Sequence, residues 1–494
     1  MLSEALQGKK LSKAEYKKRV PKLRASLLRA QESLREEEFP LLILVSGADG
    51  AGKGSTVNLL NEWLDPRYVR TRAFKRPNEY DQLRPPFWRF WKALPAKGTT
   101  AIFIGSWYSE PIFQFMNGHI DNDQFMAELQ LINEFERSLV DNGIVLLKYW
   151  LHMSKKDQEK RLEKLVTDPD NRWRVSGEDW HQLEVYEQFT EVAELTLQST
   201  QAYNNPWQVV DGGNKRYRDV AIGESILTTL DDCVSQHSSK TQTANPVDLA
   251  PIVSGQSLAD VNLNQQLSKE VYKNELKLLQ AKLGKLSRQA LKENRGSVIV
   301  MEGWDAAGKG GLIRRITPGL DARSFQVIPI AAPTDVENAH HYLWRFWLHV
   351  PQGGNVTIFD RSWYGRVLVE RIEEFTPESL WKKGYREINE FEQHLTDHGI
   401  AVVKFWVHID ADEQLRRFKE RETISHKQYK ITEEDYRNRD QWKKYESAVN
   451  EMVARTSTGN APWHLIAGND KYFARVQALR IYCEQLEKSL NASW

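Results

Sequence analysis

The stretch SVIVMEGWDAAGKGG, residues 297–311, decides the fold class of this chain. An apolar run rich in β-branched residues leads into a glycine-rich loop, and the segment after the lysine is compatible with a helix. A G-x-x-x-x-G-K loop between a strand and a helix lets backbone N–H groups surround phosphate oxygens, and the helix N-terminus adds a favourable dipole. We therefore predict a phosphate-binding P-loop in which Lys309 supplies a point charge. Its other predicted phosphate-binding residues are Gly303, Ala306, Ala307, Gly308 and Gly310.

The loop departs from the common nucleotide-triphosphatase pattern at two positions. Gly310 follows the lysine, where that pattern has the Ser or Thr whose hydroxyl holds Mg²⁺, and Asp305 lies inside the loop. A carboxylate beside phosphates is repelled unless a cation lies between them. We therefore expect Asp305 to bind Mg²⁺ in place of the missing hydroxyl. A glycine-rich turn that binds no ligand is the alternative.

An acid and a base follow a second predicted strand, NVTIFD at residues 355–360. Asp360 ends this strand, where P-loop folds place a second acidic metal ligand, and Arg361 comes directly after it. Phosphoryl transfer depends mainly on positioning and on neutralising the charge that spreads over the phosphoryl oxygens, which suits an Asp–Mg²⁺ and Arg pair. We predict a catalytic role for both residues, as for Asp305 and Lys309. A surface ion pair between Asp360 and Arg361 is the alternative.

A basic segment, residues 413–446, follows the next predicted strand. Arg417 and Arg421 are four residues apart and therefore share one helical face, and we predict that both bind phosphate. Kinases of this architecture carry a lid that closes over the phosphates at this place in the chain. Because acidic residues interleave the basic ones, a solvated charged face is the alternative. Further basic residues of the segment include Arg416, Lys427, Lys430, Arg437, Arg439, Lys443 and Lys444.

The whole pattern occurs twice in the chain. SGADGAGKGS at residues 46–55 matches EGWDAAGKGG at residues 302–311, and Lys309 minus Lys53 gives an offset of 256 residues. Other matches, such as the two copies of WRFW and INEFE, keep the same offset without a gap. A single register over more than 200 residues indicates duplication of a whole domain rather than of a short repeat unit.

Each copy alternates short apolar runs with helical patterns, which favours a buried parallel sheet covered by helices on both faces. The predicted class is therefore α/β, with two tandem α/β/α sandwiches. We place the domains at residues 1–234 and 259–494, joined by a polar, Pro- and Ser-rich linker at residues 235–258. In the second copy the apolar runs lie at residues 297–302, 326–330, 355–360, 400–407 and 463–467.

Composition excludes several classes of protein. The two cysteines, Cys233 and Cys483, are too few for a disulfide scaffold and fit a reducing compartment. No apolar h-region opens the chain, and no run of about 18 apolar residues occurs, so we expect a cytoplasmic protein that does not enter the membrane. The net charge is only +1, so a site for a polyanion must come from local clustering of basic residues.

Taken together, the motifs resemble the polyphosphate kinase 2 family. The resemblance rests on GWDAAGKGG, FDRSWYGRVLVERIEEF, NEFEQHL, QLRRFKER, TSTGNAPW and NDKYFARV, and it covers nearly the whole chain. The duplicated layout is similar to the two-domain class of that family, the polyphosphate:AMP phosphotransferases.

The resemblance implies a thymidylate-kinase-like sandwich with a helical lid in each copy. It also implies transfer of the terminal phosphoryl group of inorganic polyphosphate to AMP, giving ADP, with Mg²⁺ or Mn²⁺ as the cofactor. Asp305, Lys309, Asp360 and Arg361 match the two phosphate and metal motifs of the family. Arg417 and Arg421 match its basic helix before the lid.

The first copy lacks part of this machinery. It keeps Asp49 and Lys53, but Ile104 and Gly105 stand where the second copy has Asp360 and Arg361. A site that has lost both a metal ligand and a charge-stabilising arginine should lose most transition-state stabilisation. We therefore expect a non-catalytic first copy that packs against the second as an internal pseudo-dimer, with further homo-oligomerisation left open. Three further replacements are Leu165 for Arg421, Leu183 for Arg439 and Asn214 for Asp470.

Three other functions compete with this prediction. An ATP-dependent nucleoside monophosphate kinase would use the same fold, but Gly310 and Asp305 argue against it. A non-enzymatic polyphosphate-binding scaffold would not need Asp360 and Arg361. A nucleic-acid-binding ATPase would carry a recognition module, and the sequence contains none, so we expect no nucleic-acid partner.

Overall fold

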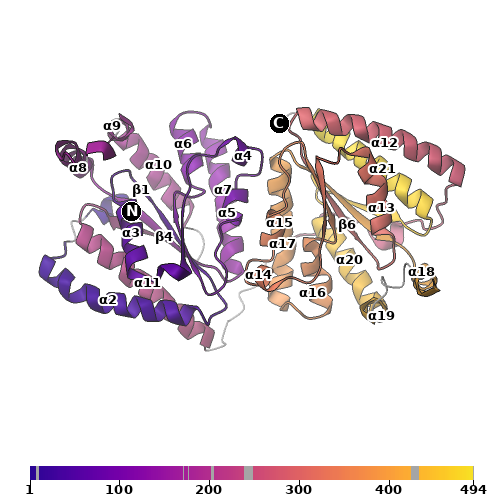
Figure 1. The fold of residues 1–494 in the computed structure, drawn as a ribbon, viewed down its shortest axis with the longest axis horizontal. Coiled ribbons are helices and arrows are strands. Elements are labelled where there is room, and N and C mark those ends of the chain that lie inside the picture. Colours follow the sequence, from indigo (N-terminus) through magenta and orange to yellow (C-terminus); the bar gives the residue numbers. More distant parts are fainter. Residues whose placement is uncertain are drawn as a thin grey trace. The chain divides into compact units, whose positions relative to one another are not determined.

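The computed structural model describes the chain except residues 7–9, 171, 176, 202–204, 239–248, 424–432 and 493–494. The predicted lid residues Lys427 and Lys430 lie outside the described residues. The chain forms two compact units (Figure 1). Unit 1 comprises Met1–Pro77, Arg89–Thr243 and Thr334–His341, and unit 2 comprises Asn78–Trp88, Ala244–Pro333 and Tyr342–Trp494.

Each unit is built on a five-stranded parallel sheet. The strand order is β2-β3-β1-β4-β5 in unit 1 and β7-β8-β6-β9-β10 in unit 2, so the two sheets have the same topology. The central strands β1 and β6 are buried along almost their whole length, as their continuous apolar runs predict. The strands are β1 (Leu41–Gly47), β2 (Val69–Ala73), β3 (Thr100–Ile104), β4 (Val145–His152), β5 (Trp207–Asp211), β6 (Ser297–Gly303), β7 (Phe325–Pro329), β8 (Val356–Asp360), β9 (Ala401–His408) and β10 (Trp463–Ala467).

The helices of the first copy alternate with its strands. Helix α2 packs against α11, and α7 packs against β4. The α2 helix begins with a capping box between Ser12 and Glu15, which satisfies two N-terminal N–H groups. The helices are α1 (Leu2–Ala5), α2 (Lys13–Leu34), α3 (Lys53–Trp63), α4 (Glu79–Gln82), α5 (Trp88–Trp91), α6 (Ser109–Met116), α7 (Asn122–Asp141), α8 (Lys155–Thr167), α9 (Gly177–Glu184), α10 (Tyr186–Ser199) and α11 (Lys215–Ser238), with 3₁₀ turns η1 (Pro66–Tyr68) and η2 (Arg172–Arg174).

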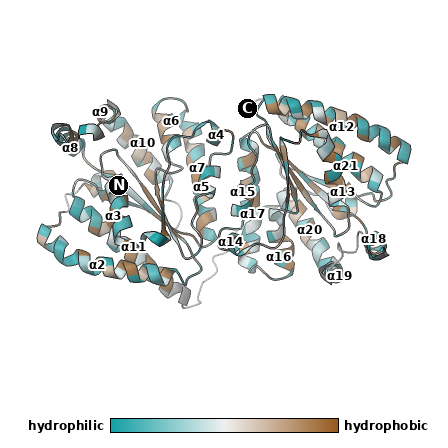
Figure 2. Ribbon diagram, viewed as in Figure 1, coloured by the Kyte–Doolittle hydropathy of each residue, from teal (hydrophilic) through white to brown (hydrophobic). Residues whose placement is uncertain are grey.

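The second copy repeats this arrangement, with α12, α13 and α21 in one layer and α17 and α20 in the other (Figure 1). Figure 2 shows apolar residues concentrated in the strands, while long helices such as α12 also carry polar residues. The predicted α/β/α class is therefore confirmed. The helices are α12 (Lys269–Lys292), α13 (Lys309–Ile316), α14 (Asp335–Asn338), α15 (Trp344–Trp347), α16 (Val369–Ile372), α17 (Glu378–Asp397), α18 (Ala411–Thr423), α19 (Glu433–Asp440), α20 (Trp442–Thr456) and α21 (Lys471–Asn491), with 3₁₀ turns η3 (Leu258–Asp260), η4 (Thr317–Gly319) and η5 (Trp363–Val367).

A buried charged cluster anchors η5, the turn that follows Arg361. Lys404 of β9 donates to Glu392 of α17 at 2.6 Å and to the carbonyl of Thr456 at 2.6 Å. Tyr364 of η5 donates its hydroxyl to the same carboxylate at 2.7 Å. A buried ion pair with all its hydrogen bonds made specifies one arrangement of the elements that it joins.

The first copy contains the same cluster. Lys148 donates to Glu136 at 2.7 Å and to the carbonyl of Thr200 at 2.8 Å, and Tyr108 donates to Glu136 at 2.6 Å. Because both copies keep the cluster while only one keeps the Asp–Arg pair, the cluster is a feature of the fold. Among the described helices, none combines the length and the apolar character needed to cross a lipid bilayer.

Candidate active site

The P-loop of the second copy connects β6 to α13, as predicted. Gly303 must be glycine because its φ is +147° and because a Cβ there would lie 2.5 Å from the carbonyl oxygen of Val407. Gly308, with φ of +112°, is the N-cap residue of α13, which begins at Lys309. The loop therefore presents the helix N-terminus toward the carboxyl edge of the sheet, where a phosphate can approach it closely.

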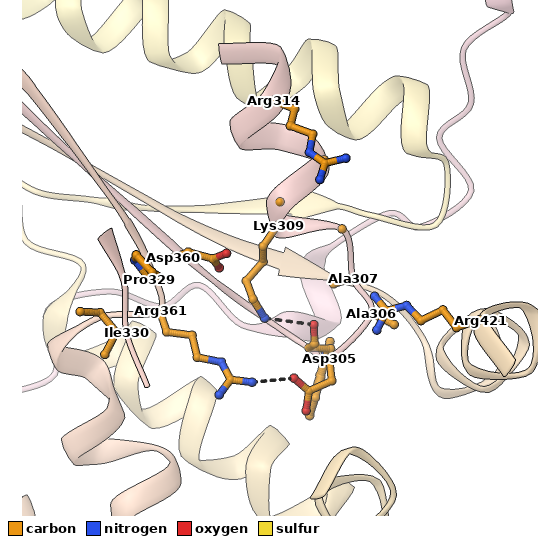
Figure 3. A pocket seen from close by; sticks show the side chains of 14 residues that line it. Asp305, Ala306, Ala307, Lys309, Arg314, Pro329, Ile330, Asp360, Arg361 and Arg421 are labelled. Atoms are coloured by element: carbon orange, nitrogen blue, oxygen red, sulfur yellow. Dashed lines mark hydrogen bonds and ion pairs between the residues drawn. The ribbon is translucent and has the colours of Figure 1, made fainter. Parts of the chain in front are cut away.

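A pocket of about 370 Å³ lies over this loop. Figure 3 shows the side chain of Lys309 running between those of Asp360 and Asp305, while the guanidinium group of Arg361 reaches across to Asp305. Residues from four separate segments of the sequence thus meet at one place. The lining residues are Trp304, Asp305, Ala306, Ala307, Gly308, Lys309, Gly310, Gly311, Arg314, Pro329, Ile330, Asp360, Arg361 and Arg421.

The charged groups of the pocket contact one another across the loop. Lys309 donates its Nζ to the carbonyl oxygen of Gly303 at 2.7 Å, which turns the ammonium group back over the loop. Arg361 Nη2 donates to Asp305 Oδ1 at 3.2 Å, and Asn438 of α19 donates to Asp305 Oδ2 at 3.0 Å. Asn438 escaped the sequence analysis because an asparagine in a charged segment carries no signal of its own.

The carboxylates of Asp305 and Asp360 both line this pocket, and they fit a magnesium ion. Mg²⁺ commonly takes one or two protein carboxylates and completes its octahedron with water and substrate phosphate oxygens. The described residues contain no group of three or more His, Cys, Asp and Glu side chains that could hold a metal by themselves. The two carboxylates therefore suit a metal that arrives together with phosphates.

The structure separates the two predicted arginines of α18. Arg421 lines the P-loop pocket, whereas Arg417 is 3% exposed and lies beneath the loop. Arg417 donates to the carbonyl oxygens of Ala306 at 3.1 Å, Ala307 at 2.7 Å and Gly468 at 2.6 Å. These contacts tie the P-loop to the end of β10. Arg417 therefore holds the loop from below and borders only the second pocket, whereas Arg421 lines both the P-loop pocket and the second pocket.

A second pocket, of about 220 Å³, continues from the P-loop along α13, α18 and α21. Its basic side chains are Arg417 and Arg421 of α18 and Lys471 and Arg475 of α21, and Glu420 is its one acidic lining residue. The sequence analysis missed the two residues of α21, although they lie within the NDKYFARV motif. Only the tertiary fold brings the start of α21 beside the P-loop.

A third, smaller pocket of about 90 Å³ adjoins the loop and is partly apolar. Leu368, Val369, Trp406 and Tyr445 line it, together with Asp305, Lys309 and Arg361, which it shares with the first pocket. Trp304, also in its wall, stacks on Trp442 of α20 with ring centroids 3.8 Å apart. Trp304 also donates to His408 Nδ1 at 2.9 Å, and burial lowers the pKa of His408 to about 4, so that its ring is a neutral acceptor.

Comparison with known proteins shows the family. The family model described as polyphosphate kinase 2 matches residues 10–238 and again residues 266–493. The chain belongs to the polyphosphate kinase 2 family. The motif resemblance is thereby confirmed, including its occurrence in both copies.

Individual relatives of the polyphosphate kinase 2 family match over the full length. A protein of Pseudomonas aeruginosa named polyphosphate:AMP phosphotransferase is 46% identical over 99% of both chains. A protein of the same name from Pseudomonas syringae pv. tomato is 43% identical, again over 99% of both chains. A crystal structure assigned to polyphosphate kinase 2 from Pseudomonas aeruginosa covers 100% of both chains with a TM-score of 0.89 at 44% identity.

The first polyphosphate kinase 2 copy has a differently organised P-loop. Lys53 forms an ion pair with Asp49 at 2.7 Å, whereas in the second copy Asp305 contacts Arg361 instead. Arg218, which is 1% exposed, stands where the second copy has Ala474. The guanidinium group lies so close to the loop that a Cβ on Gly52 would be 1.9 Å from its Nη1. Arg218 thus fills space that borders the basic pocket in the second copy.

Proposed function

We propose that this chain transfers the terminal phosphoryl group of inorganic polyphosphate to AMP, giving ADP, and that the reaction takes place in the second copy. The observation that supports this most is the meeting of Asp305, Lys309, Asp360 and Arg361 around one P-loop pocket. The full-length relatives named polyphosphate:AMP phosphotransferase support the same substrates.

The residues of the pocket suit a reaction in which charge spreads over phosphoryl oxygens. Lys309 and Arg361 place two positive charges beside the loop, and backbone N–H groups at the start of α13 add donors. Asp305 and Asp360 would hold Mg²⁺, or Mn²⁺ as a substitute, and the ion would neutralise phosphate charge. Because the ends of two strands fix these groups, they need little rearrangement during the transfer.

The three pockets suggest where each substrate binds. The basic pocket with Arg421, Lys471 and Arg475 suits a linear polyanion, because a chain of phosphates needs positive charge along its length. The smaller pocket with Leu368 and Val369 suits a nucleoside, because it offers an apolar wall and nearby polar groups. We place polyphosphate in the first of these pockets and AMP in the second, with the P-loop pocket between them.

The first copy is non-catalytic in this proposal, and its P-loop is dispensable for the chemistry. Its bounds, residues 1–234, and those of the catalytic copy, residues 259–494, are part of the proposal. Neither the half-buried Cys233 nor the buried Cys483 forms a disulfide in the described part of the chain, which supports a reducing, cytoplasmic location.

The test is to incubate the protein with AMP, polyphosphate and Mg²⁺, without ATP, and to measure ADP. We expect ADP to form, AMP to be a better acceptor than ADP, and excess chelator to stop the reaction. Formation of ADP only when ATP replaces polyphosphate would favour the nucleoside monophosphate kinase. Binding of polyphosphate without any transfer would favour the scaffold.

Matched variants locate the chemistry. Lys309→Ala should lower the rate on the order of 10²-fold, the scale seen when one preorganised charge-stabilising donor is lost. Lys53→Ala removes the same group from the first copy and should change the rate less than about threefold, because that site lacks the acid and the arginine. Both variants are first checked for native thermal unfolding. Comparable losses in the two variants would show that the copies share the catalysis.

A further inference from the structure

A buried carboxylate, that of Glu302, lies next to the P-loop and in the wall of the smaller pocket. Glu302 is the last residue of β6 before Gly303 and is 6% exposed. Its Oε1 accepts a hydrogen bond from the hydroxyl of Ser362 at 2.8 Å, and Ser362 is itself 3% exposed. Burial raises the pKa of Glu302, and the charge of the nearby Lys309 opposes that rise. Burying a carboxylate is costly, so its retention needs a reason.

Ser362, the hydrogen-bond partner of Glu302, directly follows Arg361, whose backbone conformation is strained. Arg361 has a φ of +66°, in the left-handed region, where a non-glycine residue is strained and persists only if its surroundings hold it. Two contacts flank this residue and hold the turn. The Arg361 N–H donates to the carbonyl oxygen of Met301 at 3.0 Å, and the Ser362 hydroxyl donates to Glu302.

The first copy shows that the fold does not require this pair. Gly105, the counterpart of Arg361, adopts a φ of +69°, so the same turn forms there. Ser106 matches Ser362, but Ser46 stands in place of Glu302. The Ser106 hydroxyl is buried without a hydrogen-bond partner, and the Ser106 N–H donates instead to the hydroxyl of Ser109 at 3.2 Å.

The glutamate is therefore lost together with the arginine and the aspartate, while the serine and the backbone turn remain. By contrast, both copies keep the buried Lys–Glu–Tyr cluster that anchors the following turn. A residue that the fold needed would be present in both copies, as the residues of the cluster are, but Glu302 is present only in the second copy. The copy that lacks this glutamate is the copy that lacks the charged Asp–Arg pair of the predicted phosphate site.

We propose that Glu302 is a positioning residue for phosphoryl transfer: through Ser362 it holds the turn that directs the Arg361 guanidinium toward Asp305 and the P-loop pocket. The inference rests on the proposed function, because it assigns a role in that reaction. Glu302 also lines the smaller pocket in which we place AMP, but the role proposed here is the placement of the arginine. Misplacing a reacting or charge-stabilising group by about 1 Å can cost on the order of 10²-fold in rate.

The test is a double-mutant cycle that joins Ser362→Ala with Arg361→Ala. Alone, Ser362→Ala should lower kcat on the order of 10-fold, with little change in the KM for AMP. In the Arg361→Ala background the same change should lower kcat less than about twofold, because the arginine that it positions is already gone. An equal loss in both backgrounds would overturn the proposal, since a purely structural serine acts independently of the arginine.

A second pair of variants tests the glutamate itself. Glu302→Gln keeps an acceptor for the Ser362 hydroxyl and should retain most of kcat, whereas Glu302→Ala leaves that hydroxyl unpaired and should match Ser362→Ala. If Gln were as damaging as Ala, the charge rather than the hydrogen bond would matter and the positioning role would be wrong. Ser106→Ala in the first copy is the matched control and should leave kcat unchanged, since its hydroxyl has no partner.

Failure of the proposed function has a different signature. If the wild-type chain formed no ADP, that function would fall whatever the variants did. The same variants would then be compared by the rise in unfolding temperature that inorganic triphosphate produces in each of them. Coupling between Ser362→Ala and Arg361→Ala in that rise would support the positioning role, and its absence would overturn it.

Discussion

At the scale of single residues, the two copies act as controls for each other. The turn after β3 and the turn after β8 share a left-handed residue, which is Gly105 in one copy and Arg361 in the other. Glycine adopts this conformation without strain, and arginine does not. The second copy therefore retains a strained residue where a glycine would serve the fold better. Such strain is typical of positions that serve a reaction.

This strain predicts a difference between two variants at the same position. Arg361→Gly should be more stable than Arg361→Ala by about 1 kcal/mol, because both remove the side chain but only glycine relieves the left-handed backbone. Both variants should lose kcat to the same extent, because each lacks the guanidinium group. The measurement is chemical denaturation of the two proteins side by side, with ADP formation as the second readout. Equal stability of the two variants would show that the turn carries no strain.

At the scale of elements, the basic pocket depends on helices that meet only in the fold. Arg421 lies on α18, while Lys471 and Arg475 lie in the first turns of α21. Asp219 of the first copy stands at the position of Arg475, so that copy has reversed a charge at the equivalent place. Two helices must therefore cooperate to line the pocket with positive charge, and the first copy has lost that arrangement.

We expect the charges of this pocket to govern the use of polyphosphate. Arg475→Ala and Arg421→Ala should each raise the KM for polyphosphate on the order of 10-fold, which corresponds to about 1.4 kcal/mol of lost interaction. The KM for AMP should change little. Both effects should shrink as salt rises, because the Debye length falls from about 10 Å at 0.1 M to about 3 Å at 1 M.

A control for this prediction lies on the same helix. Arg480 of α21 pairs with Glu275 at 2.8 Å and is half-exposed, away from the residues that line the pocket. Arg480→Ala should therefore leave the KM for polyphosphate unchanged. A loss of AMP affinity alone in the Arg421 and Arg475 variants would mean that this pocket holds the acceptor.

At the scale of the whole molecule, duplication gave one chain two P-loop domains that have diverged at several positions. In the first copy, Ile104 and Gly105 stand at the positions of Asp360 and Arg361. In addition, the Arg218 side chain lies against the P-loop of that copy. Lys53 is also paired with Asp49. These changes lie in separate elements, so a single substitution cannot reverse them.

Restoring the missing pair should therefore not restore catalysis. The variant carries Lys309→Ala to silence the second copy, together with Ile104→Asp and Gly105→Arg. A Cβ at residue 105 would lie 2.6 Å from the carbonyl oxygen of Phe74, so the new arginine would have to displace the backbone. ADP formation should stay at the level of Lys309→Ala alone. A clear rise above that level would show that the first copy lost only its Asp and Arg.

The sequence by itself determined the α/β class, the duplication, the P-loop and the family. Short runs of contiguous residues carry the signals for these features, because a buried strand, a glycine-rich loop and a helix start each depend on local composition and spacing. The predicted strands confirm this, since all five runs of the second copy form strands within about two residues of their expected bounds. The predicted proximity of Asp360 and Arg361 to the loop follows from the same rule for parallel sheets.

Only the tertiary structure decided how the residues divide their work. It placed Arg417 beneath the loop, while Arg421 also reaches the P-loop pocket, although both lie on one helical face in the sequence. It also brought Asn438 to Asp305, Ser362 to Glu302 and Arg475 to the P-loop helix. These pairs are 60 or more residues apart in the chain, and their contacts depend on how whole elements pack. Packing leaves no pattern in the nearby sequence, so composition and spacing could not predict these contacts.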